Sequence, residues 1–136
     1  MKTLYDLLKG LPLLIATALC SFPSSAFDLN GIWATDAQLC SKMFERRGSD
    51  IAFTPLSDLY GSGFVIDGTH IKGKMAQCTI QSQKQDGEIL QIEAACATEI
   101  MRSDMQFSLK IINDKTISRR FLGMSGIEVN YYRCPL

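Results

Sequence analysis

Apolar and polar residues alternate along most of the chain after Gly48, in short runs separated by turn residues. A period of two is typical of β-strands that bury one face, and the Asp67-Gly68 pair is a strong signal for a two-residue hairpin turn. The pattern predicts an all-β fold, an antiparallel up-and-down barrel of about eight strands, with a β-sandwich as the alternative. The expected strands are Leu29–Ala34, Asp50–Thr54, Gly63–Ile66, Thr69–Lys74, Met75–Ser82, Ile89–Thr98, Met105–Ile112, Thr116–Leu122 and Ile127–Cys134.

One segment has helical rather than alternating spacing. Thr35 and Gln38 have the separation of a capping box, which marks a helix start. Arg46 and Arg47, followed by Gly48, are typical of a helix end. We therefore expect one short α-helix over Asp36–Arg47 that covers or plugs the barrel. Its buried face would consist of Leu39, Cys40, Met43 and Phe44.

The first 26 residues are typical of a secretory signal peptide. Lys2 and Lys9 precede or flank an apolar run, Leu11–Phe22, and small residues at Ser24–Ala26 suit a signal peptidase. The run is too short for a membrane-spanning helix, which needs about 20 apolar residues. Lipidation at Cys20 is disfavoured by Leu19 before it. We expect an exported protein, periplasmic or secreted, with a single domain over residues 27–136.

Removal of the signal peptide takes away Lys2, Lys9 and Asp6, which changes the formal charge from 0 to −1. A near-neutral domain lacks the basic surface that nucleic acids or anionic membranes require. We expect neither as a partner.

Four cysteines remain in the mature chain: Cys40, Cys78, Cys96 and Cys134. An even number in an exported domain implies two disulfides, and counting alone allows three connectivities. If Gly87 is the centre of the turn between two of the strands, Cys78 and Cys96 are equidistant from it and face each other on the buried side. Cys40 then pairs with Cys134. Closing loops of about 20 and about 100 residues contributes roughly 3 and nearly 5 kcal/mol in the chain-entropy model.

A zinc site or free thiols are the alternatives for these cysteines. No C-x-x-C pair occurs, whereas structural zinc sites usually bring ligands in close pairs. We expect no metal and no cofactor.

Alternation also assigns faces at the two ends of the sheet. In the last strand Val129, Tyr131 and Arg133 share the inward face, so Cys134 points outward to the helix. Trp33 faces inward from the first strand. Arg133 is therefore expected to lie over the Trp33 indole.

A Gly-x-Trp near the mature start, a short helix, a meander of strands and a late Arg resemble the lipocalin-like barrels of calycin type, including the small bacterial periplasmic protease-inhibitor barrels. In those families the Gly-x-Trp opens the first strand and the Arg packs on the Trp. The resemblance implies these structural roles for Gly31, Trp33 and Arg133. Together with the absence of an N-x-S/T sequon, it favours a periplasmic location.

No catalytic constellation is evident. His70 is the only histidine, and no Gly-x-Ser-x-Gly nucleophile elbow occurs. A Ser62–His70–Asp67 grouping is conceivable only by chance. We predict no catalytic residues and expect the protein not to be an enzyme, a hydrolytic enzyme being the disfavoured alternative.

The loop Pro55–Gly63 is the candidate binding segment, because loops on a rigid barrel often carry function. Its candidate residues are Leu56, Leu59, Tyr60 and Ser62, which form either a lid over an apolar pocket or a wedge for another protein's cleft. In the simpler alternative, the leucines only cap the core. Arg119 and Arg120 could form a basic spot for an acidic partner, but strand alternation already accounts for Arg120, so only Arg119 is unusual.

We expect a non-catalytic binding protein, most concretely an inhibitor of an extracytoplasmic hydrolase of protease or lysozyme type, since the barrels that it resembles have largely filled interiors. A carrier of a small apolar ligand is the alternative, and it requires an open interior.

Overall fold

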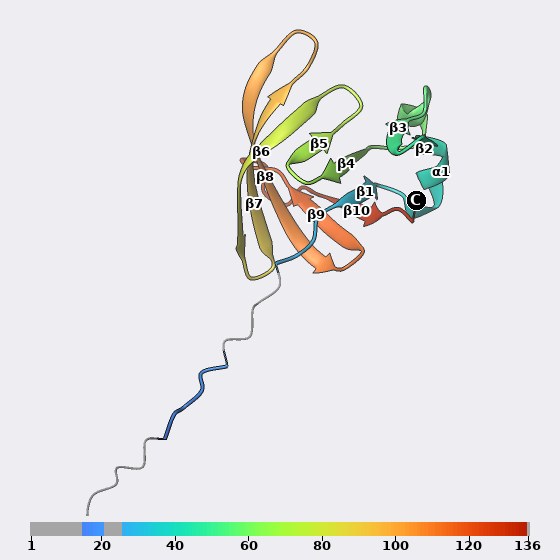
Figure 1. The fold of residues 1–136 in the computed structure, drawn as a ribbon. Helices are drawn as coiled ribbons and strands as arrows, with labels where there is room; N and C mark the ends of the chain where they lie inside the picture. Colours follow the sequence, from blue (N-terminus) through green and yellow to red (C-terminus); the bar gives the residue numbers. More distant parts are fainter. Residues whose placement is uncertain (1–14, 21–25, 136) are drawn as a thin grey trace, which may run out of the picture.

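The computed structural model describes residues 15–20 and 26–135. Most of the expected signal peptide, residues 1–14 and 21–25, lies outside the described residues. Eight antiparallel strands close a barrel in the order β1-β10-β9-β8-β7-β6-β5-β4 (Figure 1). The strands are β1 Gly31–Ala34, β4 Gly63–Asp67, β5 His70–Lys72, β6 Gln77–Asp86, β7 Ile89–Ala97, β8 Arg102–Asn113, β9 Thr116–Arg120 and β10 Glu128–Arg133.

Closure comes from β1, which pairs with both β4 and β10. The expectation of an all-β, up-and-down barrel is thus confirmed, and the sandwich alternative is wrong. The β5–β6 and β7–β8 connections lie at one end, which is at the top of Figure 1, and the turns at Gly87 and Asp114 lie at the other. We call these the upper and lower ends.

The centre of the barrel interior is filled by apolar side chains from all around the wall. Trp33, Leu90 and Ile117 have no exposed surface. The buried cluster consists of Leu29, Trp33, Ile66, Cys78, Leu90, Ile92, Ala94, Cys96, Leu109, Ile117 and Tyr131.

A side lobe inserted between β1 and β4 packs on the outside of the barrel (Figure 1). It consists of α1 Cys40–Met43, β2 Phe44–Arg47 and β3 Asp50–Phe53, of which the last two form a separate hairpin. Its apolar residues meet the outward-facing Ile32 and Ala34 of β1 in a second buried cluster. The lobe covers the wall and does not plug the barrel.

The predicted helix over Asp36–Arg47 is wrong in its second half. A 3-10 turn, Ala37–Leu39, precedes the single helical turn of α1, and Phe44–Arg47 is a strand. The helix ends at Met43, whose carbonyl accepts a hydrogen bond at 2.9 Å from the N–H of Thr54, the residue that follows β3, rather than from a further helical turn. Phe44 then pairs with Phe53, whose ring centroid lies 4.9 Å away. Gly48 does adopt a positive φ of 64°, but in the β2–β3 turn.

The capping box is also wrong by one residue. Asp36 is the N-cap, and its carboxylate accepts a hydrogen bond from the Gln38 N–H at 2.9 Å. Thr35 instead accepts a hydrogen bond from the backbone of Ser62. The prediction that Cys40, Met43 and Phe44 are buried is confirmed.

Both predicted disulfides are confirmed. Cys78 and Cys96 face each other in the barrel interior, and Cys40–Cys134 joins α1 to the end of the last strand. The second bridge spans 94 positions and therefore ties the side lobe to the C-terminus.

Arg133 lies over Trp33 as expected, with its Cζ 4.3 Å from the ring centroid. Its guanidinium also joins three segments at the lower end, because it donates to the backbone carbonyls of Asp28 at 2.8 Å, Asp114 at 3.0 Å and Asn30. This arginine closes the seam where the first and last strands meet.

Candidate functional site

The predicted binding loop lies between β3 and β4, beside the side lobe. Leu56 and Leu59 are 62% and 73% exposed, so they do not cap the core. Tyr60 is half-buried against the second cluster, and Ser62 is exposed. The loop contains a 3-10 turn, Ser57–Leu59. It therefore presents two leucines to solvent while its tyrosine attaches it to the lobe.

The loop is held at its C-terminal end by Thr35. The Thr35 N–H donates to the Ser62 carbonyl at 2.9 Å, and the Ser62 N–H donates to Thr35 Oγ1 at 3.1 Å. Gly61 makes this approach possible, since its φ is +134° and a Cβ there would lie 2.5 Å from Thr35 Oγ1. These contacts fix the backbone at the C-terminal end of the loop.

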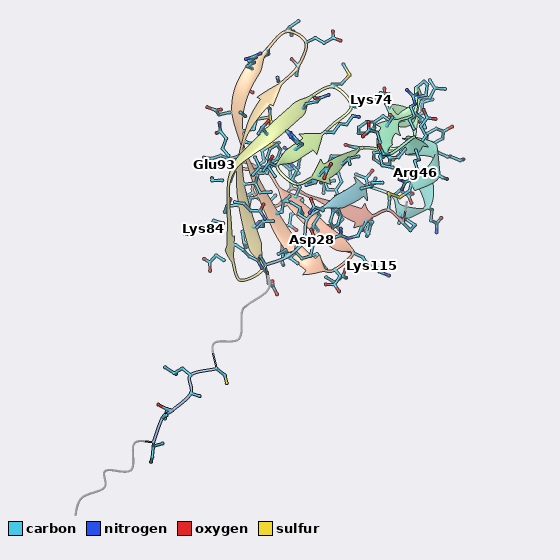
Figure 2. All side chains as sticks on the ribbon, viewed as in Figure 1. Asp28, Arg46, Lys74, Lys84, Glu93 and Lys115 are labelled. Atoms are coloured by element: carbon cyan, nitrogen blue, oxygen red, sulfur yellow. A yellow bond between two sulfur atoms is a disulfide. The ribbon has the colours of Figure 1, made fainter. Side chains whose placement is uncertain are left out.

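A second attachment comes from Lys74 in the β5–β6 connection. Its ammonium pairs with the Asp58 carboxylate and donates to the Pro55 carbonyl at 3.2 Å. Figure 2 shows Lys74 at the upper end of the barrel, next to the β5–β6 tip. The Pro55–Gly63 loop and the upper connections therefore belong to one end of the molecule.

Exposed apolar side chains gather in the loops of this end. Met75 follows Lys74 and is 78% exposed, while Ile100 and Met101 in the β7–β8 connection are 90% and 61% exposed. The β7–β8 connection is ordered by Thr98, whose hydroxyl accepts hydrogen bonds from the N–H groups of Ile100 and Met101. We call the five residues Leu56, Leu59, Met75, Ile100 and Met101 the apolar loop end.

Of this set, the sequence pattern indicates only the two leucines. Met75 lies inside an expected strand, and the pattern predicts no role for Ile100 and Met101. A signal was present, because apolar residues in turns cannot be explained by strand alternation.

Arg119 and Arg120 have different surroundings. Arg120 lies on the outer face, 3.6 Å from the Glu128 carboxylate. Arg119 lies between two aromatic rings, with its Cζ 4.9 Å from the Phe107 centroid and 4.6 Å from the Phe121 centroid. The two arginines do not form a joint basic spot.

The residues of the conceivable triad are not brought together. Asp67 and His70 are cross-strand neighbours in the β4–β5 hairpin, and His70 is exposed. Ser62 precedes the other end of β4, roughly 16 Å away at the rise of a β-strand. In residues 15–20 and 26–135, no group of His, Cys, Asp or Glu side chains is arranged to hold a metal ion. None of the helices in the described part of the chain has the length and apolar character needed to cross a membrane.

Among the surface hollows of the described residues, two lie at opposite ends of the barrel. One of about 560 Å³ at the lower end is bounded by Phe27, Asp28 and Arg133. The other, of about 830 Å³, lies against the upper parts of β5 to β8, next to the Cys78–Cys96 bridge. The second hollow reaches the upper end of the buried cluster, because Cys78 and Cys96 belong to that cluster and also line the hollow. The residues at the centre of the cluster, Trp33, Leu90 and Ile117, line neither hollow.

Comparisons with protein-family models, with curated proteins and with solved structures found no match to this chain.

Proposed function

We propose that the protein is an exported, non-catalytic binding protein that inhibits an extracytoplasmic hydrolase through its apolar loop end. The observation that carries this proposal is the state of the Pro55–Gly63 loop: Leu56 and Leu59 are 62% and 73% exposed on a backbone anchored by Thr35 and Lys74. Exposed apolar groups in the loops at one end of the molecule favour a protein partner. A pre-ordered loop loses little entropy on binding, which favours affinity.

The packed centre of the barrel interior supports a protein partner over a small ligand. A carrier needs free volume inside the barrel, whereas Trp33, Leu90 and Ile117 meet there without exposed surface. The binding surface is then the outside of the molecule and its loops.

We further infer that the barrel is of lipocalin type. The support is the arrangement of Gly31, Trp33 and Arg133, in which the arginine packs on the indole at the barrel seam. An exported location is supported by the two disulfides, since such bridges persist in oxidising compartments.

The experiment is an inhibition assay with the oxidised mature chain, residues 27–136, against a panel of serine proteases, metalloproteases and lysozymes. We expect stoichiometric inhibition of one class. A double variant, Leu56→Ser with Leu59→Ser, is expected to raise the inhibition constant by about 100-fold, because both side chains are candidates for buried interface anchors.

The matched control is Ile112→Ser on the lower half of β8, whose side chain is 49% exposed but lies outside the apolar loop end. It should leave inhibition unchanged, and neither variant should lower the melting temperature much, since all three side chains are exposed. Inhibition that survives the double variant, or no inhibition of any hydrolase in the panel, would contradict the proposal.

A further inference from the structure

The barrel wall is incomplete next to the upper half of β8. β7 pairs with β8 as far as Arg102, but β9 pairs with it only from Ser108 downward. The segment Arg102–Phe107 therefore has a neighbouring strand on one side only. We call it the open edge of β8.

The hydrogen-bonding groups of the open edge can be assigned. The Ile111 N–H donates to the Glu88 carbonyl at 2.7 Å, which is on the β7 side. Because the N–H and C=O groups of successive strand residues point to opposite sides, odd-numbered residues of β8 face β7. Arg102, Asp104 and Gln106 then direct their backbone groups to the open side.

Nothing in the described part of the chain covers these groups. Residues 102–106 are exposed, and no backbone hydrogen bond within residues 26–135 reaches them from the β9 side. The chain leaves the sheet after Arg120 and returns only at Glu128 in β10. An unpaired edge of this length is a template for another strand.

Arg119 lies at the lower end of the open edge. It shares the inward face with Ile117, and its guanidinium reaches up to the Phe107 ring. The inward-facing residues of β8 become more exposed from its middle toward the upper end: Leu109 is 3% exposed, Phe107 is half-buried and Met105 is 38% exposed. A group bound at the edge can therefore contact Arg119.

The guanidinium of Arg119 has aromatic neighbours but no acceptor. Phe107 and Phe121 flank it, and among the described residues no carboxylate or other side chain forms an ion pair or hydrogen bond with it. Arginine presents its donors in a planar fork that matches a carboxylate. The unused donors are therefore suited to an acidic group.

We propose that the partner protein docks an extended segment on the open edge of β8, where it adds a strand and places a carboxylate against Arg119. The proposal rests on the proposed function and specifies how the partner is recognised. Backbone hydrogen bonds along the edge would provide affinity, as in other strand additions, and Arg119 would select an acidic residue on the inward face. Asp104 points outward and disfavours an acidic residue opposite it.

The decisive variant is Gln106→Pro. Proline has no backbone N–H. Because the N–H of Gln106 points away from β7, its loss removes no hydrogen bond of the barrel, and the variant should fold as before. Docking of a partner strand on the open edge should be blocked. Gln106→Thr is the matched control, since it changes the side chain and keeps the N–H.

Arg119→Gln tests the contact with the partner's carboxylate, and Arg120→Gln is its control. Arg119→Lys keeps the positive charge but loses the planar fork of donors.

The dissociation constant is measured with the hydrolase that the wild-type protein inhibits. We expect Gln106→Pro to weaken binding by about 30-fold or more and Arg119→Gln by about 10-fold, with both controls within about twofold. Amide hydrogen exchange at Asp104 and Gln106 should slow in the complex. Unchanged affinity of Gln106→Pro, together with loss of affinity in the Leu56→Ser, Leu59→Ser variant, would overturn the strand addition and leave the proposed function standing.

A second measurement needs no hydrolase. The acetylated and amidated peptide Val-Thr-Glu-Val-Thr and its Gln counterpart are titrated into 15N-labelled protein at millimolar concentration. The expected result is shifts at the amides of Asp104 and Gln106 and at the Arg119 side chain, larger with the Glu peptide and absent in Gln106→Pro. No shift at the edge would overturn the proposal. Sedimentation without peptide checks whether the chain forms a dimer. A dimer in which the amides of Asp104 and Gln106 are protected from exchange would overturn the proposal in favour of edge pairing between two copies of the chain.

Discussion

Cys78 and Cys96 lie opposite one another in the β6–β7 hairpin, with Cα atoms 4.0 Å apart, although the turn by itself would leave them one position out of register. Next to the turn Asp86 pairs with Ile89, and continuing that register would set Cys96 opposite Thr79. A register shift between Ile80 and Ser82 leaves Gln81 unpaired and corrects the offset. The bulge, rather than the turn, aligns the disulfide.

Deletion of Gln81 should therefore be tolerated. Without the extra residue the two halves of the hairpin share one register, and Cys78 still faces Cys96. We expect peptide mapping under non-reducing conditions to recover the same bridge and the melting temperature to fall only slightly.

Insertion of an additional residue after Gln81 is the matched control. It moves Cys78 one position past Cys96 and should yield free or scrambled thiols. The same disulfide yield in both variants would contradict the role given to the bulge.

Gly31→Ala should destabilise the barrel seam. The φ of Gly31 is +138°, and a Cβ would lie 2.8 Å from Arg133 Nη1, so the guanidinium must leave its carbonyl partners. We expect the free energy of unfolding in urea to fall by about 2–4 kcal/mol.

Gly123→Ala is the control, since its φ is also positive, at +81°, but a Cβ there has open space around it. It should lower the free energy of unfolding by only about 1 kcal/mol, which is the cost of placing a non-glycine residue at a positive φ. Equal losses in the two variants would show that contact with Arg133 does not determine the requirement for glycine.

Thr35→Val should loosen the Pro55–Gly63 loop without unfolding the barrel. The valine keeps the shape of the side chain and removes the acceptor of the Ser62 N–H. We expect amide exchange at Ser62 to accelerate by about 10-fold, which corresponds to the loss of one hydrogen bond. Hydrolase inhibition should weaken several-fold.

Thr69→Val, at an exposed threonine in the β4–β5 turn, is the control and should change neither quantity. If Thr35→Val accelerates amide exchange at Ser62 but leaves hydrolase inhibition unchanged, the order of the loop is not required for its proposed function.

The fold was largely predictable because alternation and turn residues are local signals. Faces followed from the same signal, which is why Arg133 on Trp33 and the outward Cys134 were anticipated. The helix was overestimated because Phe44 suits either a helix face or a strand pair, and only its contact with Phe53 decides between them. The bulge at Gln81 leaves no sequence signal of its own.

The candidate site was predictable only in part. Leu56 and Leu59 stood out as apolar residues in a loop rich in Gly and Ser, but their exposure depends on the anchors Thr35 and Lys74, which are distant in sequence. Arg119 was recognisable as a charge on an apolar face. The open edge beside it was not, because it follows from the unequal lengths of β8 and β9.

Native mass spectrometry of the protein taken directly from its own compartment, without reducing agent, distinguishes an inhibitor from a carrier. We expect a mature chain with two disulfides, free of any small molecule, and a fraction of it in complex with a hydrolase. The Leu56→Ser, Leu59→Ser variant should lose that complex. A small apolar compound released from the chain on denaturation would instead mean an open interior and a carrier, and the proposed inhibitor function would be wrong.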